Sequence, residues 1–295
     1  MAGGFLDKLL GRPAPSPELA EALAELARLA TERPPFAGPV AVLTELLPGL
    51  AESAPNVTTP SIPPEHAAAK LAGGVPLLRG ENVPLDDRLL RRRWADVCAA
   101  VGRHRTGDGA ANLGDAVKRG RLRVDELAAA VLAGRPEEVH ARADALGLDA
   151  GLAATVLRFA LFPLLVPISA AFAPLRTGAA WGRGWCPTCG SWPLLGEFRG
   201  LEQIRWLRCG LCAADWEFPR LACPFCDNRD HNQLGYLHVE GEEDRRRAAA
   251  CESCGGYVKM LATLGPLSPL QLLVADVTTM YLDFVAAERG YAVPS

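Results

Sequence analysis

Apolar residues recur at helical spacing through residues 1–180. Ser16 supplies a cap for a helix whose apolar face carries Leu19, Leu23 and Leu26, which lie three to four positions apart. Strand-like alternation is rare in this part of the chain, so the pattern predicts an all-α domain. Further amphipathic patterns predict helices over residues 40–52, 85–103 and 124–132, a helix beginning at Pro136, and an apolar core helix over 152–173.

Residues 48–84 break this helical pattern. Proline recurs through the segment together with Ser, Thr and Gly, which interrupt regular structure. Two interpretations remain open for it: a long ordered crossing or a flexible loop.

The pattern changes at Trp181. Short alternations of apolar and polar residues at 203–207 and 234–239 predict strands of small hairpins. Helical periodicity returns after Lys259. Pro269 can open a final helix that runs to about Arg289.

Composition and charge narrow the class of protein. The chain has 295 residues, 49% of them hydrophobic and 22% charged, which is ordinary for a globular protein. The net charge is −3, so no global charge attracts nucleic acid or anionic lipid. The apolar run 159–175 is slightly short for a membrane span and contains three prolines, so we expect a buried, kinked core helix.

The N-terminal residues lack the pattern of a signal peptide, because Asp7, Lys8 and Arg12 interrupt any apolar region. We therefore expect a leader followed by one helix within residues 1–35, and a cytoplasmic protein. In a reducing compartment, clustered cysteines favour metal binding over disulfides.

Eight of the nine cysteines fall into four CxxC pairs, and Cys98 stands apart as a small buried helix residue. A CxxC turn points both sulfurs to one side, and two such turns make a four-thiolate site. The intervals between successive pairs are 19, 10 and 24 residues, and only the first and third leave room for a hairpin. We expect one site from Cys186, Cys189, Cys209 and Cys212, and another from Cys223, Cys226, Cys251 and Cys254.

Other interpretations of the cysteines fit less well. An interleaved pairing of the motifs is the alternative arrangement. A dithiol oxidoreductase normally has one CxxC at a helix N-terminus, and an iron–sulfur cluster suits paired turns poorly. Four thiolates close a tetrahedral site, so hydrolysis by a metal-bound water is not expected. His231 and His238 are then not needed as ligands.

The predicted metal modules do not have the charge of a nucleic-acid surface. Residues 181–259 contain ten Lys/Arg and eleven Asp/Glu, and the thiolate sites add further negative charge. We expect Arg245–Arg247 to form a solvated hairpin tip, and Asp276 and Asp283 to be solvated carboxylates on one helix face. The tryptophans between Trp181 and Trp216 are expected to shield the thiolates rather than to stack on a ligand.

The fold class that follows is α+β, with two tandem cysteine modules between an N-terminal helical domain and a C-terminal helix. No phosphate-binding loop, nucleophile elbow or HExxH motif is present in the sequence. The predicted domains are residues 1–180, 181–220, 221–262 and 263–295.

The second half of the chain contains a distinctive series of motifs. They are Cys186-Pro-Thr-Cys189-Gly-Ser-Trp-Pro193, Leu207-Arg-Cys209-Gly-Leu-Cys212, Asp215-Trp216, Arg220-Leu-Ala-Cys223-Pro-Phe-Cys226, Leu234-Gly-Tyr236 and Cys251-Glu-Ser-Cys254-Gly-Gly-Tyr257-Val-Lys259. Over about residues 181–291 these motifs resemble the FdhE family of formate dehydrogenase accessory proteins. Ala213–Ala214 and Ala248–Ala250 depart from the family pattern, where relatives more often carry polar or acidic residues.

The resemblance implies two rubredoxin-like modules, each holding one iron or zinc ion, and a maturation factor that is not an enzyme. Its implied partner is the immature catalytic subunit of formate dehydrogenase, with no nucleic acid and no membrane span. The alternative function is a rubredoxin-like redox or oxygen-sensing role in assembly of the same enzyme.

Overall fold

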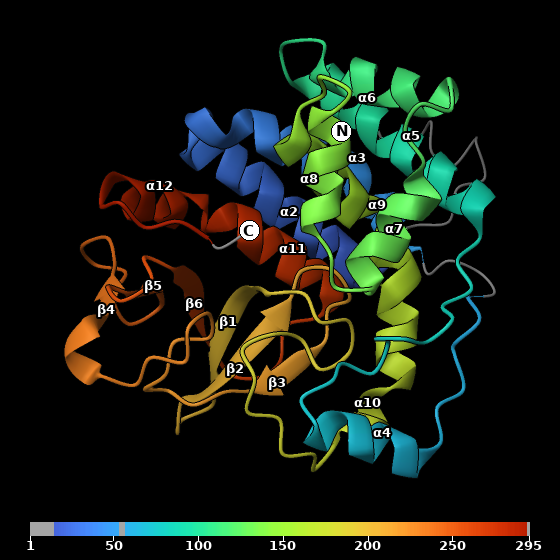
Figure 1. Ribbon diagram of the computed structural model, residues 1–295. Coiled ribbons are helices and arrows are strands. Elements are labelled where there is room, and N and C mark those ends of the chain that lie inside the picture. The colour runs from blue at the N-terminus through green and yellow to red at the C-terminus, as the bar shows by residue number, and fades with distance from the viewer. Residues whose placement is uncertain (1–14, 53–56, 294–295) are drawn as a thin grey trace.

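The computed structural model describes residues 15–52 and 57–293 of the chain (Figure 1). A helical layer lies above a single β-sheet, and the last two helices run between them. The expected α+β class is therefore confirmed. The predicted leader, and the N-terminal stretch on which the signal-peptide argument rests, lie outside the described residues.

The helical layer confirms most of the predicted helices. Ser16 accepts a hydrogen bond from the Leu19 amide at 3.2 Å, and Pro17 begins the first helix as expected. The helices of this layer are α2 (Pro17–Glu32), α3 (Ala37–Ala51), α4 (Pro64–Ala72), α5 (Asp87–His104), α6 (Gly109–Lys118), α7 (Val124–Leu132), α8 (Glu137–Asp144), α9 (Ala150–Ala171) and α10 (Ala173–Arg176), with a 3₁₀ turn, η1 (Pro34–Phe36).

The proline-rich segment is an ordered crossing over its described residues, 57–84. It carries α4, which the sequence pattern did not predict and which lies beside α10 (Figure 1). Pro64 occupies the first helical position of α4, where its missing amide hydrogen costs nothing. Beyond α4, the backbone amides of Leu77 and Leu78 donate to the carbonyls of Pro187 and Thr188, both at 2.8 Å.

Helix α9 is the core helix that the apolar run predicts. Its length and composition would suffice to cross a membrane, but 56% of its most apolar window is buried inside the protein. It packs against α5 and α8, and Pro163 and Pro167 lie within it. We therefore interpret α9 as the central helix of the helical layer.

Six strands form one mixed sheet in the order β3-β2-β1-β6-β5-β4. Each predicted module contributes antiparallel strands, and β1 pairs with β6 in parallel, so the two modules share one continuous sheet. The strands are β1 (Pro193–Arg199), β2 (Ile204–Cys209), β3 (Asp215–Glu217), β4 (Leu234–Leu237), β5 (Arg246–Cys251) and β6 (Tyr257–Thr263), with a 3₁₀ turn, η2 (His231–Gln233), before β4.

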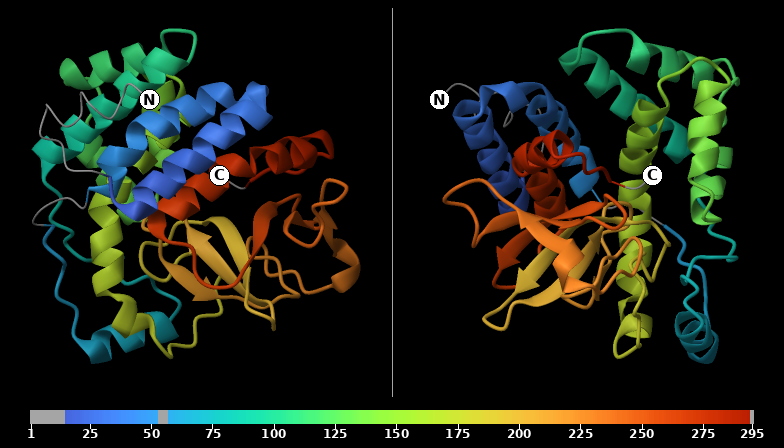
Figure 2. Two further views of the ribbon diagram at one scale, coloured as in Figure 1. Left: turned by 180° about the vertical axis from the view of Figure 1, so that it is seen from behind. Right: turned by 60° about the vertical axis from the view of Figure 1, so that its left-hand side comes forward.

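Two helices, α11 (Pro269–Thr278) and α12 (Met280–Glu288), lie against one face of this sheet (Figure 2). The prediction of a single final helix is wrong, because the chain forms two helices, α11 and α12, that meet at an angle of 45°. The break contains no proline. Instead, the Thr279 hydroxyl donates to the Ala275 carbonyl at 2.6 Å, and such bonds bend helices.

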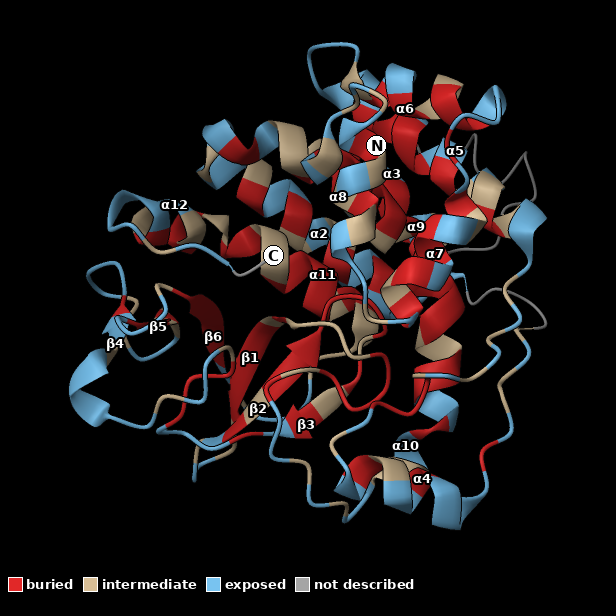
Figure 3. Cartoon of the chain, viewed as in Figure 1, coloured by how far each residue is buried: buried red, intermediate tan, exposed pale blue. Residues whose placement is uncertain are grey.

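Helix α11 joins the sheet to the helical layer, because its other side packs against α2 and α3. The buried residues of the helices and of the central strands form one continuous core, whereas η2 and the turn after β4 are exposed (Figure 3). The sheet and its cysteines are therefore held on a wide helical support.

Candidate metal centres

Two groups of four cysteines converge at the same end of the sheet, where β1, β4 and β6 begin and β2 and β5 end. Within each group the sulfurs all lie within 4.8 Å of one another. We name them the first centre (Cys186, Cys189, Cys209 and Cys212) and the second centre (Cys223, Cys226, Cys251 and Cys254). These groups contain the same residues as the pairing that the sequence spacing predicts, and they differ from the interleaved alternative.

The sulfur spacing fits a tetrahedral metal ion. Four sulfurs bound at about 2.3 Å would stand ~3.8 Å apart. The Sγ–Sγ distances are 3.7 Å and 3.4 Å for Cys186–Cys212 and Cys189–Cys209 in the first centre. In the second centre they are 3.6 Å and 3.8 Å. A disulfide would need about 2.05 Å, and all eight thiols are free.

Each CxxC turn closes in the same way. The amide of the residue after the second cysteine donates to the carbonyl of the first cysteine, at 2.9–3.0 Å in all four turns. That residue has a positive φ in every case, between 56° and 85°. The four residues are Gly190, Ala213, Asp227 and Gly255. Glycine adopts this conformation readily, whereas alanine and aspartate adopt it rarely.

Backbone and side-chain N–H groups point at several sulfurs. The amides of Thr188 and Leu211 lie 3.4 Å from the sulfurs of Cys186 and Cys209, and the Asn228 side-chain nitrogen lies 3.7 Å from Cys251 Sγ. Burial opposes ionisation of Cys251, but donors from Cys254 and Asn228 outweigh it and lower its pKa to about 7. Such donors stabilise thiolates, which are the form that binds metal.

The first centre is sealed by the helical layer. All four of its cysteines are buried. The segment containing Leu77 and Leu78 bonds to this turn, and Arg176 donates to the Thr188 hydroxyl at 2.9 Å. The proline-rich crossing therefore covers the first centre, which nothing in its own sequence indicates.

The second centre faces solvent. Cys223 and Cys251 are buried, but Cys226 and Cys254 are exposed. Its surroundings come from its own module, including Asn228, and from the C-terminal chain, where the Ala292 amide donates to the Gly255 carbonyl at 2.9 Å. The two centres thus differ in access, although their sulfur geometry is the same.

Aromatic rings connect the two centres. Trp185 meets Trp192 at 6.0 Å between ring centroids, and Trp192 meets Phe225 of the second centre at 5.5 Å, both edge to face. The Trp181 indole N–H donates to the Trp185 carbonyl at 2.8 Å. These rings pack the chain that lies between the two centres, and shielding of the thiolates by the tryptophans stays a prediction.

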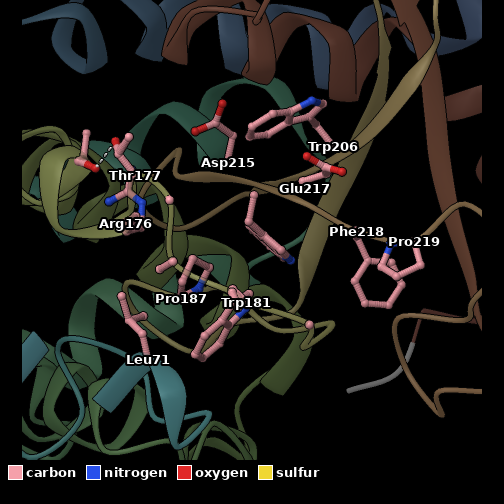
Figure 4. Close-up of a pocket in the computed structure, with 16 residues that line it drawn as sticks. Leu71, Arg176, Thr177, Trp181, Pro187, Trp206, Asp215, Glu217, Phe218 and Pro219 are labelled. Atoms are coloured by element: carbon pink, nitrogen blue, oxygen red, sulfur yellow. Dashed lines mark hydrogen bonds between the residues drawn. The ribbon is translucent and has the colours of Figure 1, made fainter. Parts of the chain in front are cut away.

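A cavity of about 730 Å³ lies between β3 and the chain that follows α10 (Figure 4). Trp181, Trp206 and Trp216 line it together with Arg176 and Glu217. The sequence did not single it out, because its walls come from segments that are distant along the chain.

The other predicted residues have varied environments. Cys98 is buried in α5, and burial raises the pKa of its thiol to about 12, as suits a packing residue. His231 and His238 are exposed and belong to neither centre.

Two expectations about surface charges are wrong. Asp276 and Asp283 are not simply solvated, because both accept hydrogen bonds from the buried Lys259 ammonium, at 2.8 Å and 2.9 Å. Arg246 and Arg247 belong to β5 instead of a hairpin tip, and Arg247 stacks on two aromatic rings.

Comparison with known proteins gives one family. A sequence model described as "FdhE, central domain" matches residues 185–220, which contain the first centre. The FdhE homologue of Stutzerimonas stutzeri is 41% identical over 110 residues, covering 36% of this chain and 35% of that protein. The homologue of Aquifex aeolicus is 31% identical over 152 residues, covering 49% and 52%. The chain thus matches about a third to a half of the length of these relatives.

A solved structure extends the likeness to nearly the whole chain. The crystal structure of the FdhE protein from Pseudomonas aeruginosa matches with a TM-score of 0.58 and 26% identity, over 94% of this chain and 93% of that one. The motif resemblance, the match of residues 185–220 to the central domain and the fold shared with the Pseudomonas aeruginosa protein all point to the FdhE family.

Proposed function

We propose that this protein is a non-catalytic accessory factor in the maturation of formate dehydrogenase, and that it acts in the cytoplasm. It binds the immature catalytic subunit through the sheet that carries the two metal centres. Each centre holds one ion, iron or zinc. The metal supplies structural cross-links there, and the thiolates and their N–H donors hold it.

The observation that carries this proposal is the pair of closed four-thiolate centres in one sheet. Four protein ligands leave no coordination position for a substrate, which argues against metal-centred hydrolysis. The sheet is instead a metal-stabilised surface supported by helices, as suits a binding protein. The likeness to the FdhE family supplies the partner.

A pull-down with the formate dehydrogenase catalytic subunit tests the proposal. We expect capture by the wild-type protein, and loss of both capture and dehydrogenase activity when Cys189 and Cys251 are changed to Ser together. Cys98→Ser is the matched control, since that thiol belongs to neither centre, and it should behave as wild type. Full capture and activity after loss of both centres would contradict the proposal.

A second candidate function is favoured by the exposure of Cys226 and Cys254. A solvent-facing four-thiolate iron site could exchange electrons or respond to oxygen during assembly. Metal analysis and a visible spectrum of protein purified without oxygen distinguish the two. Stoichiometric zinc without iron would remove this candidate, and iron with a reversible colour change would favour it.

A further inference from the structure

The sheet has a second face, opposite α11 and α12, on which arginines gather. Cross-strand partners share a face, so Phe198 with Arg205, and Tyr236 with Ala249, lie on the same side. Lys259 points the other way and bonds to α11 through Asp276. We name the group of Arg205, Arg220 and Arg247, with Phe198 and Tyr236, the arginine face; Arg220 and Tyr236 are its exposed members.

The guanidinium groups of this face converge on two rings. Arg220 and Arg247 lie 4.9 Å and 4.6 Å from the centroid of the same Phe198 ring. Arg247 also lies 4.5 Å from the Tyr236 ring. Within the described part of the chain, none of these arginines forms an ion pair with a carboxylate. Stacking on rings leaves their N–H groups available to an acceptor.

Arg205 is the buried member of the arginine face and supports the loop that contains Arg220. It is 5% exposed, and its Nη1 donates to the carbonyls of Pro219 and Ala222, at 3.3 Å and 2.9 Å. These carbonyls flank Arg220, so Arg205 holds the loop that presents Arg220. Its buried Nε lacks a hydrogen-bond partner among the described residues.

The shape of the face indicates the size of the ligand. The cavity beside Arg205, Arg220 and Tyr236 has a volume of about 50 Å³, which suits the end of a side chain rather than a free metabolite. Around it Tyr236 and Leu221 are 40% and 64% exposed, so the surface is open to a longer segment. Guanidinium groups on aromatic rings are suited to carboxylates, which they bind in a planar fork.

We propose that the arginine face docks an acidic segment of a partner protein, with a carboxylate between Arg220 and Arg247. This inference deepens the proposed function, on which it rests, by naming the chemistry of the partner segment. Residues 181–259 contain slightly more acidic than basic side chains, so the arginine face is a local positive surface, and its charge is complementary to an acidic segment.

A binding assay with a fluorescent hexaglutamate peptide tests it on the full-length, metal-loaded protein. We expect saturable, salt-sensitive binding that weakens by at least about tenfold in the Arg220→Gln/Arg247→Gln double variant. Arg229→Gln is the matched control, because Arg229 is exposed on the same module but already pairs with Asp227. It should bind as wild type does. Circular dichroism and metal content show that each variant is folded.

Three outcomes would overturn the inference: no saturable peptide binding, an equal loss in Arg229→Gln, or tighter binding of a single-stranded oligonucleotide than of the peptide. The catalytic-subunit pull-down then separates the two proposals. If the wild type captures the subunit but does not bind the peptide, the proposed role of the arginine face is contradicted and the accessory function stands. If the wild type does not capture the subunit, the accessory function itself is contradicted.

Discussion

At the scale of residues, the four turn-closing positions show how sequence and structure can disagree locally. Gly190 and Gly255 suit a positive φ, but Ala213 and Asp227 adopt it as well, with φ of 58° and 56°. The surrounding hydrogen bonds impose this conformation on a side chain that disfavours it, at a cost of about 1 kcal/mol or more. The sulfur cluster, rather than local preference, decides the backbone there.

Replacing Ala213 by Gly should therefore stabilise the protein, by about 0.5–1 kcal/mol, because it removes the left-handed strain. Gly255→Ala is the mirror control, since a Cβ there meets nothing within 4 Å and only the φ of 68° matters. It should destabilise by a similar amount. Urea unfolding of the metal-loaded protein measures both, and equal signs for the two variants would refute the strain argument.

Lys259 is a buried charged residue at the contact between the sheet and helices α11 and α12. Its side chain is 4% exposed and pairs with Asp276 and Asp283. Burial opposes ionisation of Asp276, but Lys259 and Arg158 hold its pKa below the ordinary value. Ionised Asp276 therefore contributes to stability above the usual aspartate pKa, and this contribution is lost as the pH falls through the lower pKa that Asp276 has in the folded protein.

Lys259→Met should lower the free energy of unfolding by about 3 kcal/mol at neutral pH, because it removes the buried cation that the partly buried Asp276 and Asp283 share. The difference from wild type should narrow at mildly acidic pH, since protonation removes the uncompensated charge. Lys118→Met, at a side chain that is 76% exposed, is the control and should be nearly neutral. A deficit that is independent of pH would show that lost packing alone is responsible.

At the scale of elements, local signals were sufficient for much of the fold. The Ser16–Pro17 start of α2 and the apolar run of α9 lie within single helices, so the sequence pattern predicts them. The sequence pattern does not predict helix α4, because the helix lies in a proline-rich segment and buries only two residues, Ala67 and Leu71. The parallel pairing of β1 with β6 joins distant strands, and no local pattern encodes it.

The candidate centres were predictable for the same reason. CxxC spacing is local, and hairpin lengths suggest which pairs meet. What the sequence did not indicate is the difference in burial, because the cover over the first centre comes from Leu77, Leu78 and Arg176 in the helical layer. Exposure of the second centre therefore emerges only from the three-dimensional arrangement.

That difference predicts the order of metal loss. A chelator should remove the ion of the second centre faster, because Cys226 and Cys254 are exposed while all four cysteines of the first centre are buried. Alkylation followed by peptide mass spectrometry should label Cys226 and Cys254 first, and Cys98 should stay unlabelled in the folded protein. Simultaneous labelling of both centres would mean that they open together.

At the scale of the whole molecule, the two modules behave as one unit. They share a sheet, rings from both meet at Trp192 and Phe225, and Gly184 lies directly against the backbone of Pro224. A methyl group at Gly184 would overlap the Pro224 carbonyl oxygen. This contact places the chain before the first centre on the turn of the second, so strain at one should reach the other.

Gly184→Ala should accordingly destabilise the protein by about 1–3 kcal/mol, the usual cost of overpacking, and should speed metal release from the second centre. Gly182→Ala is the control, because a Cβ at Gly182 meets nothing within 4 Å. Thermal unfolding and chelator kinetics measure both effects. Unchanged release from the second centre, despite lower stability, would show that the modules are not coupled through this contact.

The most direct test is native mass spectrometry of the full chain purified without oxygen. Two closed centres predict two metal ions in the wild type and one in either Cys209→Ser or Cys254→Ser, each variant losing the ion of its own centre. A wild-type mass that corresponds to one metal ion or none would contradict the existence of two four-thiolate metal centres. So would a mass that is lower by the hydrogens lost on disulfide formation.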